Sequence, residues 1–320
     1  MGAELRVYRR RIRSVESTKK ITKAMELIAA SRIVKAQARM NAAKPYAREM
    51  QRALAALEVD PTLRHPMLTG VDEPRRAGIL LITSDRGLAG GYNANAIKAA
   101  NELARKLERD GKEVERYIIG RKGTAYYNFR RIDLAGSWTG FSEQPKFIDA
   151  RGATETVVAA LSATSEGEVD EGKPGIDELW VIYTKFVNSV SQTPTAVQVA
   201  PVKSATDGDD DSGPGQADGD DESDERDSGG LIEFEPEPAR LIEALLPRYI
   251  SSRIFSALLE SAASESAARR RAMKSASDNA TDLIRTYTRL ANQARQAEIT
   301  QEISEIVGGA DALASAGESQ

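Results

Sequence analysis

Two long rows of apolar or small residues, one toward each end of the 320-residue chain, repeat in alternating steps of three and four. That spacing is the heptad seam of a coiled coil, which needs a second helix to cover it. The first row contains Ile33, Ala36, Met40, Ala43, Ala47, Met50, Leu54 and Leu57. The second contains Met273, Ala276, Ala280, Leu283, Tyr287, Leu290, Ala294 and Ala297. We therefore expect the two ends to pair with each other as an antiparallel coiled coil.

Helices of this length do not fit inside a compact domain. At a rise of 1.5 Å per residue, 57 helical residues span roughly 85 Å. We expect Pro45 to bend the N-terminal helix rather than end it, because the seam continues beyond it. In the C-terminal helix, Pro247 marks a start or a kink, and Gly308 and Gly309 end the strong helical pattern.

The apolar rows change phase once in each helix. After Leu5, Tyr8, Ile12 and Val15, the residues Ile21, Met25, Leu27 and Ile28 fall out of step with the later seam. Near the other end the row shifts to Ile299, Ile303, Ile306 and Val307. A helix with apolar residues off its seam has a second side to bury, so we expect a third surface, from another protein, to cover both segments.

The middle of the chain has the pattern of an α/β domain. Short apolar runs at 77–83, 114–119 and 179–183 predict strands, and an alternating run at 195–202 predicts another. A helical pattern covers about 92–108. Strands that alternate with helices predict a Rossmann-like layer. The fold class is therefore mixed α/β with a long antiparallel two-helix coiled coil.

The predicted domain organisation follows these patterns. Residues 1–58 form the N-terminal coiled-coil helix, 74–202 the central α/β domain with a polar insertion at 162–175, and 239–310 the C-terminal helix. The segment 203–230 carries net charge −9 and no apolar residue larger than Ala, so we expect it to be disordered. Its aspartates lack the spacing of a calcium-binding loop.

Composition excludes several kinds of chemistry. The chain has no cysteine, so thiol catalysis and disulfides are ruled out. The lone histidine, His65, lies between Pro61 and Pro66, where we expect a loop residue and not a metal ligand or an acid–base catalyst. No 18-residue apolar run exists, and the polar, basic start does not form a secretory signal. We expect no metal and no cofactor.

Two features leave other functions open. Residues 1–57 carry net charge +10, which would suit binding to nucleic acid. However, the basic residues are interleaved with a heptad seam and aromatic residues are scarce, which favours a surface that faces another protein. The turn Gly87–Gly91 follows a strand, where glycines can hold a phosphate, but it matches no nucleotide-binding motif. A nucleic-acid scaffold and a small α/β enzyme are therefore the alternatives to a mechanical role.

Four blocks of sequence resemble the gamma subunit of F-type ATP synthases, the central rotor stalk. They are IRSVESTKKITKAMELIAASR (12–32), LITSDRGLAGGYN (81–93), SSRIFSALLESAASESAARRRAMKSASDNATDLI (251–284) and NQARQAEITQEISEIVGGA (292–310). They occur in the family's order. The two insertions depart from the shorter family pattern and resemble those of actinobacterial members.

The resemblance implies a non-catalytic rotor. The paired helices would stand inside a ring of alternating alpha and beta subunits, and the α/β domain would sit with epsilon on the membrane c-ring. Proton flow would turn the stalk and change the catalytic sites of beta in sequence. The chain would thus be a peripheral protein on the cytoplasmic face of the cell membrane, held there by the complex and bound to no nucleic acid.

The resemblance also implies roles for particular residues. The beta-contact residues would be Lys20, Lys23, Met25, Arg86, Arg295, Gln296, Thr300, Glu302 and Glu305. The residues Ile299, Ile303, Ile306 and Val307 would form an apolar bearing, where directional bonds would hinder rotation. We expect Met25→Lys to leave folding intact and to impair coupling, because the added charge falls off the seam.

Overall fold

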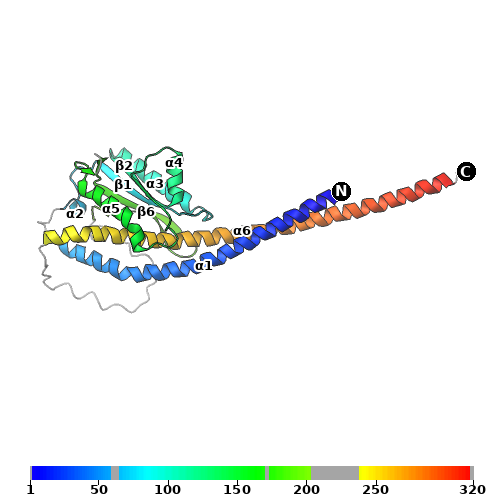
Figure 1. Cartoon of the computed structure of the whole chain (residues 1–320), viewed down its shortest axis with the longest axis horizontal. Helices are drawn as coiled ribbons and strands as arrows, with labels where there is room; N and C mark the ends of the chain where they lie inside the picture. The colour runs from blue at the N-terminus through cyan, green and yellow to red at the C-terminus, as the bar shows by residue number, and fades with distance from the viewer. Residues whose placement is uncertain (1, 59–64, 170–172, 203–237, 318–320) are drawn as a thin grey trace. The chain divides into compact units, whose positions relative to one another are not determined.

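The computed structural model describes residues 2–58, 65–169, 173–202 and 238–317. Two helices form the ends of the chain, α1 (Gly2–Glu58) and α6 (Pro238–Gly317) (Figure 1). The chain divides into two compact units. The first unit combines residues 1–28 with 270–320, and the second spans residues 29–269, so each long helix contributes to both.

In the first unit α1 and α6 pair in opposite directions. The ring of Tyr8 lies 6.5 Å from that of Tyr287, and the hydroxyl of Thr22 shares a hydrogen bond of 2.7 Å with that of Ser277. The partner's number falls as the number along α1 rises, so the pair is antiparallel. The predicted coiled coil of the two chain ends is confirmed.

The buried side of α1 keeps one phase through the first unit. Its less exposed positions are Leu5, Tyr8, Ile12, Val15, Lys19, Thr22 and Glu26, in steps of three and four, with Met25 beside Glu26 at the edge of this row. The predicted change of phase therefore does not occur on the buried side of α1. Polar residues occupy the seam in the middle, while Ile21, Leu27 and Ile28 are exposed.

The seam of α6 differs from the predicted row at every second position, where the less exposed residue is the next one along the chain. Its less exposed positions include Met273, Ser277, Ala280, Ile284, Tyr287, Ala291, Ala294 and Glu298. Leu283, predicted to lie in the seam, is 46 % exposed. The two rows are adjacent on the helix, and spacing alone does not choose between them. The helix also continues past Gly308, because an interior glycine costs only about 1 kcal/mol relative to alanine.

The second unit contains a five-stranded sheet with the order β3-β2-β1-β6-β7. Strands β1 (Arg76–Ile82), β2 (Glu113–Ile119), β3 (Gly136–Trp138) and β6 (Glu178–Phe186) are parallel, and β7 (Gln192–Ala200) is antiparallel to β6. The connecting helices are α3 (Tyr92–Arg109), α4 (Arg121–Phe129) and α5 (Phe147–Ala163). This topology confirms the predicted Rossmann-like domain; sequence patterns missed α4, β3 and α5.

Helices cover both faces of this sheet. Ile79 and Leu81 of β1 pack in one core with α3, whereas Leu80 and Ile82 pack in another with α5 and α6. Figure 1 shows α3 and α4 on the face away from α6. Burial on both faces explains why β1 is continuously apolar instead of alternating.

The remaining elements are short. Helix α2 (Pro66–Thr69) precedes β1, and strands β4 (Glu168–Val169) and β5 (Lys173–Pro174) form an antiparallel pair within the polar insertion at 162–175. The acidic segment 203–230 lies outside the described residues. The compact units divide inside the two long helices, whereas the predicted domain boundaries follow the ends of elements.

Candidate functional site

Asp85 organises the carboxyl end of the parallel sheet. It lies in the loop after β1, and its carboxylate accepts hydrogen bonds from three backbone N–H groups: Gly140 at 2.8 Å, Ser142 at 3.0 Å and Arg121 at 3.1 Å. The Arg121 donor lies at the start of α4, directly after β2, and the other two lie in the loop after β3. One side chain therefore ties the loop after β1 to the start of α4 and to the loop after β3, at the edge where doubly wound sheets usually bind ligands.

Helix α6 closes this edge with Arg269, whose side chain is 6 % exposed. Its guanidinium donates to the backbone carbonyl of Arg86 at 3.3 Å and to that of Gly87 at 3.3 and 3.4 Å. A phosphate site would need N–H groups pointing outward from this turn. The turn instead presents carbonyl oxygens to a cation, so the arrangement does not favour phosphate binding.

Glu143, in the loop before α5, joins three arginines. One carboxylate oxygen lies 3.2 Å from Nη1 of Arg269. The other contacts the guanidinium of Arg32 on α1 and lies 3.6 Å from Nη1 of Arg86. The Glu143 side chain is 14 % exposed. We call Arg32, Arg86, Glu143, Glu265 and Arg269 the arginine–glutamate cluster.

Glu265 completes the cluster from within α6. Its carboxylate accepts from Nη2 of Arg269 at 2.6 Å, one helical turn away, and its side chain is only 1 % exposed. Burial raises the pKa of Glu265, and the nearby Arg269 charge opposes that shift. Burial also raises the pKa of the neighbouring Tyr92, and the Glu265 charge adds to it. Removing one partner of such a buried pair typically costs about 3–5 kcal/mol.

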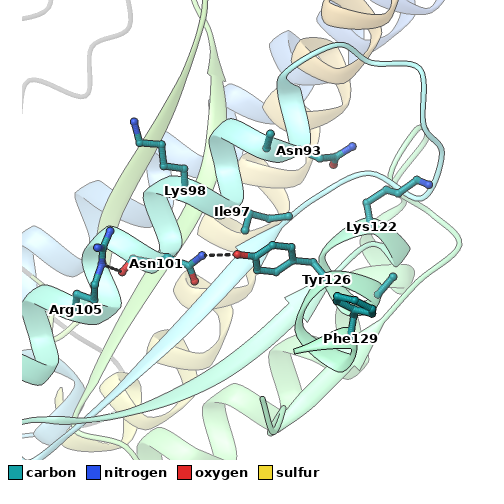
Figure 2. Close-up of a pocket in the computed structure, with 10 residues that line it drawn as sticks. Asn93, Ile97, Lys98, Asn101, Arg105, Lys122, Tyr126 and Phe129 are labelled. Atoms are coloured by element: carbon teal, nitrogen blue, oxygen red, sulfur yellow. Dashed lines mark hydrogen bonds between the residues drawn. The ribbon is translucent and has the colours of Figure 1, made fainter. Parts of the chain in front are cut away.

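A second feature is an open groove of about 730 Å³ between α3 and α4. Figure 2 shows Ile97 and Tyr126 together at its centre, with the Asn101 amide donating to the Tyr126 hydroxyl at 3.2 Å. Its lining residues are Asn93, Ala94, Ile97, Lys98, Asn101, Arg105, Lys122, Ala125, Tyr126 and Phe129. This lining offers cations and apolar surface without a carboxylate or histidine for acid–base chemistry. None of the predicted site residues lines it.

His65 has a structural position. Its Nδ1 accepts the backbone N–H of Met67 at 3.2 Å and so caps α2. Burial lowers its pKa, with a smaller opposing effect from Glu243. A neutral ring is the form that can accept this hydrogen bond, and His65 lies in a loop, as predicted.

All the predicted contact residues except Arg86 lie in the first unit, on α1 and α6. Lys20 and Lys23 are exposed, Met25 is half-buried, and Lys23 pairs with Glu26 at 3.0 Å. The exposed contact residues on α6 are Arg295, Gln296, Thr300, Glu302 and Glu305. The predicted bearing residues are also exposed: Ile299 45 %, Ile303 56 %, Ile306 72 % and Val307 54 %. Arg86 lies in the second unit, 71 % exposed.

Glu143, Glu265 and Arg269 are functional candidates that the sequence patterns did not predict. One signal was present, since Glu265 and Arg269 stand four apart in a helical stretch made otherwise of alanine and serine. A charge pair in such a small-residue stretch indicates burial with a partner. The contribution of Glu143 has no comparable local signal, because it comes from a distant loop.

These features define a class of protein. A pair of long helices carries exposed aliphatic residues off its seam, and α6 covers the ligand-binding edge of the sheet in the second unit. Within the described ranges, no helix is long and apolar enough to cross a membrane. Such a chain belongs to the class that acts by contact with other proteins.

Comparison with known proteins identifies the family. A family model described as ATP synthase matches residues 4–313. The ATP synthase gamma chain of Frankia casuarinae is 52 % identical over 318 residues, covering 98 % of this chain and 99 % of the relative. That of Acidothermus cellulolyticus is 52 % identical over 320 residues, covering 99 % of each. The chain belongs to the ATP synthase gamma chain family, the non-catalytic central stalk subunits of F-type ATP synthases.

Solved structures share the fold. A chain in the cryo-EM structure of the Euglena gracilis mitochondrial ATP synthase aligns with a TM-score of 0.65 at 18 % identity, covering 98 % of this chain and 95 % of that one. A chain from the central stalk and c-ring of the Tetrahymena thermophila enzyme aligns with a TM-score of 0.56 at 21 % identity, covering 80 % and 99 %.

Proposed function

We propose that this chain turns inside a hexamer of alternating alpha and beta subunits and couples proton flow to ATP synthesis or hydrolysis on beta. Epsilon and the c-ring of the membrane sector would hold its α/β domain. The chain would then be a peripheral protein at the cytoplasmic face of the cell membrane. Membership of the gamma chain family supports this assembly, and the remaining support comes from the surface of the first unit.

The observation that carries the proposal is the exposed aliphatic stripe near the end of α6. Ile299, Ile303 and Ile306 recur at steps of four and three, so they lie on one side of the helix, with Val307 beside them. Water-exposed aliphatic side chains in a row mark a surface that another protein covers. A surface without directional hydrogen bonds can slide past a neighbour at low resistance, as a bearing requires.

The polar residues of the first unit supply the other half of the mechanism. A ring with near three-fold symmetry has three equivalent states, and a shaft can favour one only by contacting them differently. Lys20, Lys23 and Met25 on α1 would make such contacts with an acidic region of beta. A second region of beta would be contacted by α6, through Arg295, Gln296, Thr300, Glu302 and Glu305. Arg86 would contact beta from the second unit.

Substitution of Met25 by lysine tests the proposal. Met25 is half-buried at the edge of the seam, where a lysine can extend its ammonium into water and leave the helix pair intact. We expect Met25→Lys to give a normally assembled complex whose ATP synthesis falls while ATP hydrolysis continues. Both rates are measured on inverted membrane vesicles that contain the complex.

Ala42→Lys is the matched control, because it adds the same charge at an exposed position of α1 outside the predicted contacts. It should leave the ratio of synthesis to hydrolysis unchanged. Parental synthesis rates in the Met25→Lys complex would refute the contact assignment. Isolation of the chain as a free monomer at native expression would count against the assembly itself.

A further inference from the structure

We propose that Glu143 and Arg269 are positioning residues that clamp the loop 84–91 to α6 and hold Arg86 outward for an acidic surface of the neighbouring subunit. The inference rests on the proposed function for the identity of that neighbour. The clamp itself is a property of the isolated chain, so the two can be tested separately.

The loop 84–91 needs an external support. It contains Gly87, Gly90 and Gly91, and both Leu88 and Gly90 have positive φ angles, of 63° and 57°. A loop rich in glycine has many accessible conformations and transmits force poorly. Without a clamp, a load on the Arg86 side chain would bend the loop and would not reach α6.

Arg269 provides that support at the level of the backbone. Its guanidinium holds two consecutive carbonyl groups of the loop, those of Arg86 and Gly87. A hydrogen bond to Glu265 at 2.6 Å holds it on one side, and an ion pair with Glu143 at 3.2 Å holds it on the other. The clamp therefore connects the loop to buried side chains of α6.

Glu143 acts on the side chain of Arg86. Its carboxylate is shared among three guanidinium groups, of which Arg32 and Arg269 are largely buried and Arg86 is 71 % exposed. The contact to Arg86 is the longest, at 3.6 Å, and surface ion pairs of this kind are weak. Arg86 can thus exchange Glu143 for a carboxylate on a partner while the rest of the cluster stays in place.

The charges of the cluster favour such a partner. Glu143 and Glu265 supply two negative charges against the three positive charges of Arg32, Arg86 and Arg269. One positive charge is left over, and Arg86 is the member that reaches solvent. A surface that bears a carboxylate would neutralise this remaining positive charge, whereas a basic or purely apolar surface would not.

The first experiment measures the clamp in the full chain alone. We expect Glu143→Ala to raise hydrogen–deuterium exchange of the Ser84 and Asp85 amides, which donate to Asn93 and Ser142, by about tenfold or more, as local opening becomes easier. Glu155→Gln is the control, because it removes the carboxylate of an exposed ion pair with Arg151. If Glu143→Ala does not fold, Glu143→Gln replaces it. Unchanged loop exchange in a folded Glu143 variant would overturn the proposal.

The second experiment asks whether Glu143 acts through Arg86 in the assembled complex. Arg86→Ala and Glu143→Ala should each lower the ratio of ATP synthesis to hydrolysis by at least about twofold. That factor corresponds to the smallest interaction energies typical of residues in one hydrogen-bond or ion-pair network. The double variant should lose no more than the worse single variant, and Glu143→Asp should restore part of the ratio. A merely structural role predicts multiplied losses.

Multiplied losses in the double variant would overturn the positioning role, as would an Arg86→Ala complex with a parental ratio. The outcome for Met25→Lys separates this failure from failure of the proposed function. If Met25→Lys uncouples the complex and Arg86→Ala does not, the rotor contact stands and only the role of Arg86 is lost. If neither has an effect, the proposed contacts as a whole are wrong.

Discussion

Thr22 and Ser277 share a 2.7 Å hydrogen bond between α1 and α6, with side chains buried in a seam that heptad spacing would fill with aliphatic residues. The Thr22 hydroxyl also lies 3.1 Å from the Lys19 carbonyl, to which it donates. It can therefore accept from Ser277. A buried polar pair of this kind penalises any sliding of the two helices that separates it, so it fixes their register.

Replacing Thr22 by valine should show how much this hydrogen-bonded pair contributes to the free energy of unfolding. The Ser277 hydroxyl would stay buried without its partner, which destabilises by about 1–3 kcal/mol. Adding Ser277→Ala should recover part of that loss, with a coupling energy of about 1 kcal/mol. Urea unfolding followed by circular dichroism measures both, with Thr18→Val on the exposed side of α1 as control. Strictly additive losses would show that the two hydroxyls act independently.

Asp177 should make the stability of the second unit depend on pH. Burial alone would raise its pKa, but hydrogen bonds from the backbone N–H groups of Ser165, Arg76 and Arg75 outweigh it, and the pKa falls below the ordinary value of 3.8. A carboxyl with a lowered pKa stabilises the fold above its unfolded-state pKa, and this stabilisation is lost as the pH falls through the folded-state pKa.

We therefore expect Asp177→Asn to lower the free energy of unfolding at pH 7 by about 1–3 kcal/mol, since the amide offers a donor where acceptors are needed. The difference from the parent should shrink as the pH falls below 3.8. Denaturant titrations over that range test this, with Asp133→Asn at an exposed site as control. A difference that stays constant with pH would contradict the argument.

Two glycines with positive φ allow the cost of backbone strain to be measured apart from the cost of steric crowding. Gly120 has φ +102°, and a Cβ placed on it would lie 2.2 Å from the Thr83 carbonyl oxygen. Gly111 has φ +82°, with nothing within 4 Å of its Cβ position. Gly111→Ala should cost about 1–2 kcal/mol from strain alone. Gly120→Ala should cost about 1–3 kcal/mol more from overpacking. Similar melting temperatures for the two variants would refute this reasoning.

The bearing residues should matter to the complex and not to the isolated chain. Ile303 is 56 % exposed, so Ile303→Ser should change the stability of the chain by no more than about 0.5 kcal/mol. Ile284→Ser, in the seam, should destabilise it clearly. In the assembled complex, Ile303→Ser should lower the rate of ATP-driven rotation, measured on single molecules. An unaltered rotation rate would argue against a bearing at Ile303.

Periodicity predicted the elements whose residues interact locally or repeat regularly. The apolar run before Ser84 predicted β1, and the heptad rows predicted both long helices. It missed β3 because the three residues Gly136–Trp138 are too few to show a period, and it also missed α4 and α5. It placed Leu283 in the seam because the adjacent row at Ile284 fits the same spacing, and only the packed helix pair distinguishes them.

Residue spacing was enough to predict that the ends of this chain pair and that Ile303 and its neighbours lie off the seam. Those facts follow from spacing along one helix, which local geometry fixes. Only in the folded chain does Glu143 meet Arg269, and only there does Arg269 cover the turn at Gly87. These contacts join segments far apart in the chain, and no local preference encodes which distant charge will neutralise which.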